Sequence, residues 1–187
     1  MKKFLRSLLI IIVTCSIIFT GYYFYMLHSP GTTAIRYIEP EKKYTSFKAL
    51  LQDPALKGKT VYVDVWRTTC GPCLAEFKAA PRLKQHFNPY GNKIAFLYIG
   101  ADISVPGEEF RWKRMIEKKN LTGYHYFITR DFFNKMWREV VKDPTIPPQF
   151  PQYFIVNATG EVVDFNAPRP TEAQVLAALE KVLGQKI

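Results

Sequence analysis

Cys70 and Cys73, with only a Gly-Pro dipeptide between them, are the residues of this chain best suited to redox chemistry. They follow Thr60–Trp66, a β-branched and aromatic stretch that predicts a buried strand, and they open a stretch with helical periodicity. Residues three apart in a first helical turn lie on one face, about 5–6 Å apart, which suits a disulfide. The helix N-terminus stabilises a thiolate, so we expect the pKa of Cys70 to fall from about 8.5 toward roughly 3.5–7.5. Cys73 lies deeper in the helix and is the expected resolving thiol.

A structural disulfide or a metal site would use the same two cysteines. Cross-linking a four-residue loop removes little entropy from the unfolded chain, so a purely structural bridge has little physical motivation. Cys70, Cys73 and His86 match half of a zinc-finger spacing, but no fourth ligand follows His86 within five residues, and the next histidine is His125. Redox chemistry is therefore the favoured interpretation, with no metal and no bound cofactor.

Asp64 lies six residues before Cys70, between two valines of the expected buried strand. A carboxyl group in that position is costly unless it is paired or kept protonated. This cost favours a functional role for Asp64.

The rest of the chain alternates strand and helix patterns and then ends in a hairpin and a helix. The expected strands are 94–99, 124–128, 153–156 and 161–165, and the expected helices are 44–56, 72–87, 108–119, 131–141 and 171–183. Asn157–Gly160 supplies the turn chemistry of the hairpin. Asp131 is the expected N-cap of its helix, whereas Thr171 and Gly184 are expected to begin and end the last helix. This order predicts an α/β fold in which helices flank a central mixed sheet.

The N-terminal segment Leu8–Leu27 contains no charged residue over 20 positions. A helix of that length spans about 30 Å, the thickness of the hydrocarbon core of a bilayer. Lys2, Lys3 and Arg6 precede the segment, and aromatic residues 22–25 stand near its end, which predicts a single-pass anchor with the following chain outside the cytoplasm.

Two alternative interpretations fit this segment less well. A cleaved signal peptide would need a shorter apolar run and a small-residue cleavage site. A lipoprotein site at Cys15 would follow poorly matching residues, and the apolar run continues past it. The expected organisation is therefore the N-terminus and anchor over 1–28, a tether over 29–43 and a folded domain over 44–187, with residues 8–27 in contact with lipid.

The chain of 187 residues has 26 Lys and Arg against 16 Asp and Glu, a formal charge of +10. In the charged stretch 102–120 the basic residues are interleaved with acidic ones, which is typical of a solvated helix face and argues against nucleic-acid binding. The 48% hydrophobic content excludes a disordered chain, and three cysteines exclude a disulfide scaffold.

Residues 60–77 (TVYVDVWRTTCGPCLAEF) resemble the active-site stretch of the membrane-tethered thiol–disulfide oxidoreductases of the TlpA/ResA type. The likeness in element order covers about Tyr44 to Leu183, with specific motifs at 64–76 and 151–160. It implies a thioredoxin-like three-layer fold behind an N-terminal transmembrane helix. It also implies a location on the bacterial cytoplasmic membrane, with the C-terminal domain facing the periplasm.

The resemblance assigns roles to single residues beside the cysteines. Asp64 matches the buried acid that helps take the proton from the resolving thiol, and Glu76 matches the glutamate of the TlpA/ResA motif. Trp66 matches the aromatic residue packed behind the site. Pro151 matches the cis-proline that faces the disulfide and binds substrate.

Two neighbouring positions depart from the family pattern and leave substrate preference open. Thr69 stands where the family usually has Trp, so an aromatic side chain is missing from the substrate face. Phe150 replaces a smaller residue before Pro151 and can supply apolar contact instead. We expect Trp66, Thr69, Phe150 and Pro151 to form the substrate side of the site.

The sequence therefore predicts a reductant of protein disulfides. The Gly-Pro dipeptide between the cysteines is that of thioredoxin, whose potential lies near −270 mV, against about −120 mV for a dedicated oxidant. The expected partners are disulfide-bonded proteins and a membrane electron donor that recharges the enzyme. The alternatives are a peptide-binding module with little redox activity and a peroxide-reducing enzyme, although the proline that usually stands upstream in peroxidase sites is missing before Thr69.

Overall fold

The computed structural model describes residues 7, 12–21, 34–38, 44–101 and 105–184. The chain forms two compact units, Met1–Pro30 and Gly31–Ile187. In the first unit residues 12–21 are helical and exposed, and Cys15 is a free, exposed thiol. Within the described residues no helix is both long and apolar enough to cross a membrane. Much of the expected anchor, together with its basic flank and its aromatic end, lies outside the described residues.

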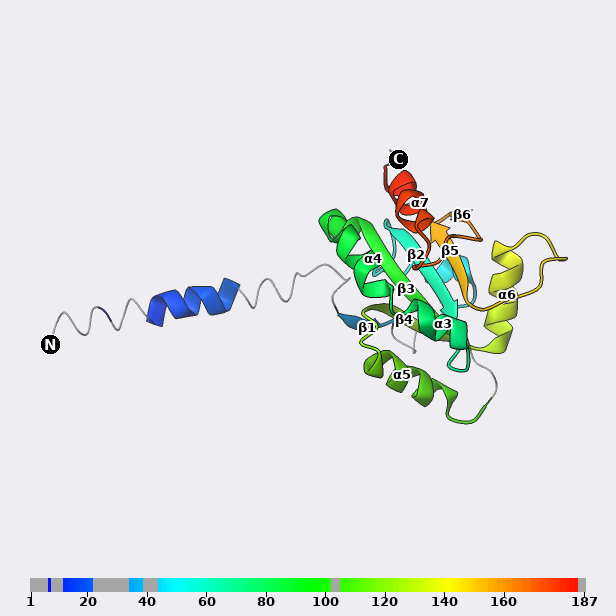
Figure 1. Cartoon of the computed structure of the whole chain (residues 1–187), viewed down its shortest axis with the longest axis horizontal. Coiled ribbons are helices and arrows are strands. Elements are labelled where there is room, and N and C mark those ends of the chain that lie inside the picture. The colour runs from blue at the N-terminus through cyan, green and yellow to red at the C-terminus, as the bar shows by residue number, and fades with distance from the viewer. Residues whose placement is uncertain (1–6, 8–11, 22–33, 39–43, 102–104, 185–187) are drawn as a thin grey trace. The chain divides into compact units, whose positions relative to one another are not determined.

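The second unit is built on a six-stranded mixed sheet (Figure 1). In spatial order its strands are β1 (Ile35–Tyr37), β4 (Gly123–Ile128), β3 (Ile94–Ala101), β2 (Thr60–Trp66), β5 (Gln152–Val156) and β6 (Val162–Asp164). The first four run parallel to one another, and β5 and β6 are antiparallel to their neighbours. Every residue of β2 and β3 is buried, as expected for central strands covered on both faces. The mixed sheet and the C-terminal hairpin are confirmed, and β1 comes from the expected tether.

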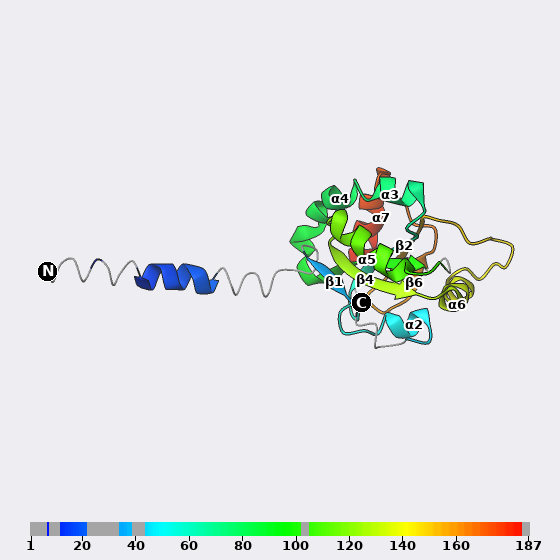
Figure 2. The ribbon, with the colours of Figure 1, turned by 90° about the horizontal axis from the view of Figure 1, so that it is seen from below.

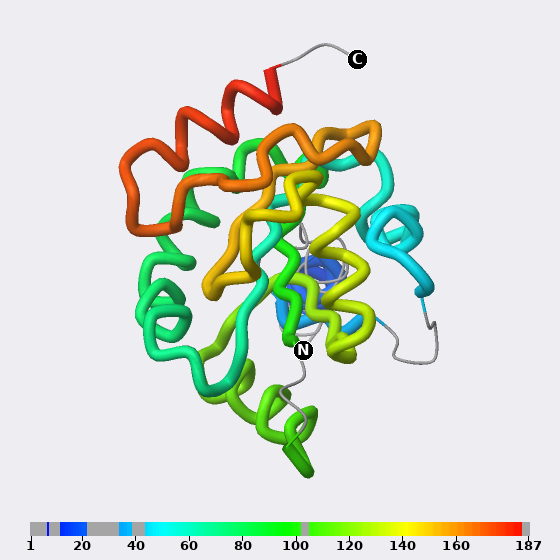
Figure 3. The backbone as a smooth tube through the Cα atoms, turned by 90° about the vertical axis from the view of Figure 1, so that its right-hand side faces the viewer, coloured from blue at the N-terminus to red at the C-terminus, as the bar shows by residue number. Residues whose placement is uncertain are grey.

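Helices cover both faces of the sheet. They are α2 (Phe47–Leu50), α3 (Gly71–Glu76), α4 (Ala80–Phe87), α5 (Glu108–Lys118), α6 (Arg130–Val140) and α7 (Gln174–Leu183), with a 3-10 helix at Asn88–Lys93. Figures 2 and 3 show α2 and α6 on one side of the sheet and α3, α4 and α7 on the other. Two apolar cores result: α2 and α6 pack on one face, and α3, α4, α5 and α7 pack on the other. These layers confirm the expected thioredoxin-like α/β architecture.

The continuous helix predicted over 72–87 is wrong. The structure has two helices, α3 and α4, separated by turns at Phe77–Ala79 in which the backbone bonds shorten to i→i+3. The cause is Pro81 in the first turn of α4, because proline has no N–H to donate and its ring would clash with the carbonyl of Phe77 in a continuous helix.

Two helix starts also differ from the prediction. The N-cap of α6 is Thr129, whose side chain accepts a hydrogen bond from the N–H of Phe132, and Asp131 lies inside the first turn. Helix α7 begins at Gln174, and Thr171 is turned toward α3 instead of capping α7. Before α6 both Thr129 and Asp131 could cap the helix, and the structure uses Thr129; before α7 the one candidate, Thr171, bonds to Glu76 instead. Gly184 ends α7 as predicted.

Candidate active site

Cys70 and Cys73 form a disulfide at the start of α3, with their Cα atoms 5.3 Å apart. Cys70 is the N-cap of α3, and its Sγ accepts a hydrogen bond from the backbone N–H of Cys73 at 3.1 Å. Cys70 is partly exposed, whereas Cys73 is fully buried. In the reduced state the same N–H and the helix dipole favour a thiolate on Cys70. The predicted placement and difference in accessibility of the two sulfurs are therefore confirmed.

Asp64 lies in β2 on the face that supports the cysteine pair. Side chains alternate along a strand, so Asp64 shares its face with Tyr62 and Trp66, and both of these pack in the same core as Cys73. Only 2% of Asp64 is exposed, and among the described residues neither carboxylate oxygen has a hydrogen-bond partner of good geometry, although the Tyr153 side chain is close enough to lower the pKa of Asp64 slightly. Burial, followed by the charge of Glu76, raises the pKa of Asp64 well above its usual value. A protonatable carboxyl group is thus held beneath the disulfide helix.

Lys84 is a charged residue of this core whose burial the sequence analysis missed. Its ammonium donates hydrogen bonds to the carbonyl and the hydroxyl of Thr122 and lies 4.7 Å from the centroid of the Tyr98 ring. Burial lowers the pKa of Lys84 to about 7, and the charge of Asp64 acts in the opposite direction. A sequence signal did exist, because Lys84 falls on the apolar stripe of α4 with Ala80, Leu83 and Phe87.

Glu76 is buried at the end of α3, with 7% of its surface exposed, so it is not an ordinary solvated glutamate. Its two carboxylate oxygens accept hydrogen bonds from the backbone N–H and the hydroxyl of Thr171, at 3.1 and 2.9 Å. This contact joins α3 to the segment before α7, 95 residues away. Glu76 therefore fixes the end of the active-site helix and adds negative charge near Asp64.

The peptide bond between Phe150 and Pro151 is cis, as the resemblance implies. β5 pairs antiparallel with β2, and Val65 lies opposite Gln152, so Pro151 stands at the same end of the sheet as the loop that leads to Cys70. The sheet register thus brings the two expected halves of the site to one edge.

The ring of Phe150 is partly buried by two neighbours. It stacks on Phe133 with the ring centroids 5.0 Å apart, and the guanidinium carbon of Arg67 lies 3.8 Å from its centroid. Burial, followed by the nearby charge of Arg130, lowers the pKa of Arg67. Phe150 therefore belongs to a cluster with Phe133 and Arg67, in addition to offering apolar surface. Arg67 was not identified from the sequence.

Trp66 and Thr69, the other two residues expected on the substrate side, lie in different surroundings. Trp66 is fully buried and packs edge-on against Phe77, with 5.0 Å between centroids, so it supports the site from behind and offers no surface to a substrate. Thr69 is exposed next to Cys70. The neighbouring Thr68 is buried and donates a hydrogen bond of 2.5 Å to Glu108 of α5.

The two histidines considered for a zinc site have other partners. His86 contacts Glu180 at 2.7 Å on the surface, and His125 is buried with its Nε2 2.7 Å from the carbonyl oxygen of Leu121. Burial lowers the pKa of His125 to about 3. Across the part of the chain that the structure describes, no three His, Cys, Asp or Glu side chains gather in a way that could hold a metal ion.

Comparison with known proteins agrees with this site. No family model and no curated relative matches the chain. A proposed thiol–disulfide oxidoreductase from Bacteroides vulgatus is 27% identical over 67% of this chain and 79% of its own, with a TM-score of 0.51. A second protein described in the same way, also from Bacteroides vulgatus, is 24% identical over 83% and 90%, with a TM-score of 0.54.

A thiol:disulfide interchange protein of the thioredoxin family, from Chlorobium tepidum, has the same fold at 18% identity, covering 68% of this chain and 82% of its own, with a TM-score of 0.54. The two less similar proteins show that the fold is thioredoxin-like. The first protein, together with the Cys70–Cys73 disulfide at a helix N-terminus, supports the activity of a thiol–disulfide oxidoreductase.

Proposed function

We propose that this protein, a thiol–disulfide oxidoreductase with a thioredoxin-like fold, reduces the disulfides of other proteins outside the cytoplasm, as enzymes of the TlpA/ResA type do. The observation that carries the proposal is the asymmetry of the cysteine pair. Cys70 is partly exposed at the N-cap of α3, whereas Cys73 is fully buried in the core on the sheet face to which Asp64 belongs. The sulfur of Cys70 can react with a substrate disulfide, whereas the sulfur of Cys73 can react only with Cys70.

The reaction follows from this asymmetry. The Cys70 thiolate attacks one sulfur of the substrate disulfide, and the other substrate sulfur leaves as a thiolate. The Cys73 thiol then gives up its proton, with Asp64 as the acceptor, and attacks the Sγ of Cys70. The mixed disulfide breaks, the second substrate thiolate leaves, and the enzyme disulfide forms. The two substrate thiolates take up protons from water, and Asp64 releases its proton to water. The enzyme has given two electrons to the substrate, so an external dithiol donor must return them.

Glu76 and the loop around Pro151 have supporting roles in this proposal. Glu76 holds the end of α3 against Thr171 and raises the pKa of Asp64 through its charge, which makes Asp64 a better proton acceptor. The backbone of Phe150, before the proline, is placed to pair with an extended substrate strand beside Cys70. Thr69 borders the same opening.

The direction of electron flow and the location are part of the proposal. The Gly-Pro dipeptide favours a reducing potential near the −270 mV of thioredoxin. The uncharged segment Leu8–Leu27, with basic residues before it, supports a retained anchor and an electron donor in the same membrane. A reporter enzyme that works only outside the cytoplasm should be active when it is fused after Leu27. A mature N-terminus beyond Tyr25 would contradict the retained anchor.

The central experiment traps substrates on the enzyme. In Cys73→Ala the mixed disulfide cannot be resolved, so partner proteins should remain attached to Cys70 and be identifiable by mass spectrometry. Cys70→Ala is the matched control and should trap none. Equilibration with a glutathione buffer should give a potential closer to −270 mV than to −120 mV. A peptide-binding module would bind partners equally well in both variants and would have no acidic thiol.

A further inference from the structure

A groove of about 700 Å³ adjoins the active-site loop on the side of α5. One wall contains Thr69, which precedes Cys70, and Leu74, which follows Cys73. The opposite wall is the exposed face of α5, with Met115 contributing an apolar side chain. A polypeptide whose disulfide reaches Cys70 can therefore extend directly into this groove.

A buried hydrogen-bond cluster fixes the position of α5 relative to the loop. Thr68 donates to Oε1 of Glu108 at 2.5 Å, and Oε2 of Glu108 pairs with Nε of Arg111 at 3.1 Å. Glu108 is only 3% exposed. This cluster ties α5 to the loop before Cys70, and it occupies Glu108, the one carboxylate among the residues that line the groove.

The remaining charges of the groove are positive. Arg111, Arg114 and Lys118 lie at positions i, i+3 and i+7 of α5 and so share one face of the helix, and Lys119 extends the same edge. Within the described chain no carboxylate pairs with Arg114, Lys118 or Lys119. Arg114 and Lys118, four residues apart, repel each other and weaken the helix slightly. An acidic partner would remove this repulsion.

We propose that this groove binds an acidic segment of the substrate protein next to the disulfide that is being reduced. The apolar side chains of Leu74 and Met115, one from each wall, add a preference for an aliphatic side chain between the acidic residues. The inference rests on the proposed function and gives it a substrate class: proteins whose reducible cysteine is flanked by Asp or Glu. Electrostatic complementarity of this kind acts mainly on the rate of association and on the choice of partner.

The test compares two synthetic peptides that share one disulfide, flanked by Glu-Leu-Glu in one peptide and by Lys-Leu-Lys in the other. The reduced full chain is the enzyme, and uncharged hydroxyethyl disulfide is the reference substrate. The acidic peptide should be reduced about ten-fold faster than the basic one at low ionic strength, and the difference should shrink to about two-fold in 0.5 M salt because exposed charges are screened.

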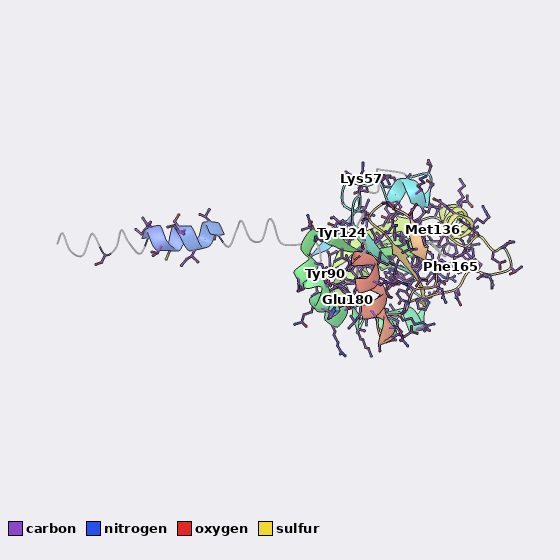
Figure 4. The ribbon with its side chains drawn as sticks, turned by 90° about the horizontal axis from the view of Figure 1, so that it is seen from above. Lys57, Tyr90, Tyr124, Met136, Phe165 and Glu180 are labelled. Atoms are coloured by element: carbon purple, nitrogen blue, oxygen red, sulfur yellow. A yellow bond between two sulfur atoms is a disulfide. The ribbon has the colours of Figure 1, made fainter. Side chains whose placement is uncertain are left out.

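Reversing charges on α5 tests whether the preference for the acidic peptide arises in the groove. The double variant Arg114→Glu/Lys118→Glu should lose about ten-fold in rate with the acidic peptide and retain its rate with hydroxyethyl disulfide. Lys48→Glu/Lys57→Glu changes the net charge equally on exposed residues of α2 and the turn after it, on the other side of the sheet (Figure 4 labels Lys57), and should keep the wild-type preference.

Equal reduction rates for the two peptides, or equal losses of rate with the acidic peptide in both double variants, would overturn the proposal that the groove binds acidic segments. Neither outcome affects the reduction of hydroxyethyl disulfide. A full chain that fails to reduce hydroxyethyl disulfide would overturn the proposed function itself, and the groove assignment with it. The two failures are therefore distinguishable in one set of measurements.

Discussion

Lys84→Met is the substitution whose effect can be worked out furthest from the structure. Methionine keeps an unbranched apolar side chain on the apolar face of α4 and removes the buried ammonium. In the folded protein burial lowers the pKa of Lys84 from 10.5 to about 7. A group whose pKa is lowered by folding contributes stability that is fully present above its unfolded pKa and is lost as the pH falls through the folded pKa.

The size of this effect follows from the displaced pKa. At about 1.4 kcal/mol per pKa unit, the wild-type protein should lose roughly 3–4 kcal/mol of unfolding free energy through Lys84 between pH 10 and pH 7. Lys84→Met has no such loss. It does lose the hydrogen bonds to Thr122, but that cost is nearly independent of pH. The difference between the two proteins should therefore shift in favour of the variant as the pH falls.

The assay is urea denaturation of the oxidised protein at several pH values from 6 to 10. Lys57→Met, in which an exposed lysine is replaced, is the control and should run parallel to the wild type. Activity gives a second readout: Lys84 lowers the pKa of Asp64, so its removal should move the pH midpoint of mixed-disulfide resolution upward. Parallel stability curves for wild type and Lys84→Met, with an unchanged midpoint, would refute the buried-charge argument.

Three further predictions concern the cysteines, the end of α3 and the proline loop. In the reduced protein, alkylation of Cys70 should show a pH midpoint below about 7.5 and Cys73 should react far more slowly, whereas faster labelling of Cys73 would reverse their roles. Glu76→Ala leaves the N–H and hydroxyl of Thr171 without their acceptor and should lower the unfolding free energy, measured by urea denaturation, by about 1–3 kcal/mol. Thr171→Val should lower it less, because the backbone hydrogen bond to Glu76 remains. An unchanged unfolding free energy in both variants would show that the contact does not stabilise the protein. Phe150→Ala removes the ring that contacts Arg67 and should slow reduction of a protein disulfide more than that of hydroxyethyl disulfide, and equal slowing of both would place its effect in the cysteine site itself.

The local features of this protein could be predicted because they depend on short-range patterns. The strand Thr60–Trp66 was predicted with its observed bounds, because a run of β-branched and aromatic residues between a glycine and a threonine leaves few alternatives. The placement of Cys70 at a helix N-terminus followed from that strand and from the proline in the next turn. The burial of Asp64 followed from its apolar neighbours in the strand.

The errors have two different causes. The division of the helix at Pro81 has a local signal, the proline itself, which the apolar periodicity of 72–87 outweighed in the prediction. The caps of α6 and α7 had none, because Thr129, Asp131 and Thr171 are all adequate capping residues. Thr171 instead bonds to Glu76, 95 residues before it, an interaction that no local pattern encodes.

Sequence alone therefore determined the chemistry of this protein, and only the tertiary structure decided its electrostatic surroundings. The contact of Lys84 with Thr122 spans 38 residues, and that of Thr68 with Glu108 spans 40. Such contacts arise when the sheet brings distant segments together, because burial then removes water and leaves each charge dependent on whichever partner lies beside it. Hydrophobic periodicity records which face of an element is buried, but it carries no information about which distant residue that face will meet.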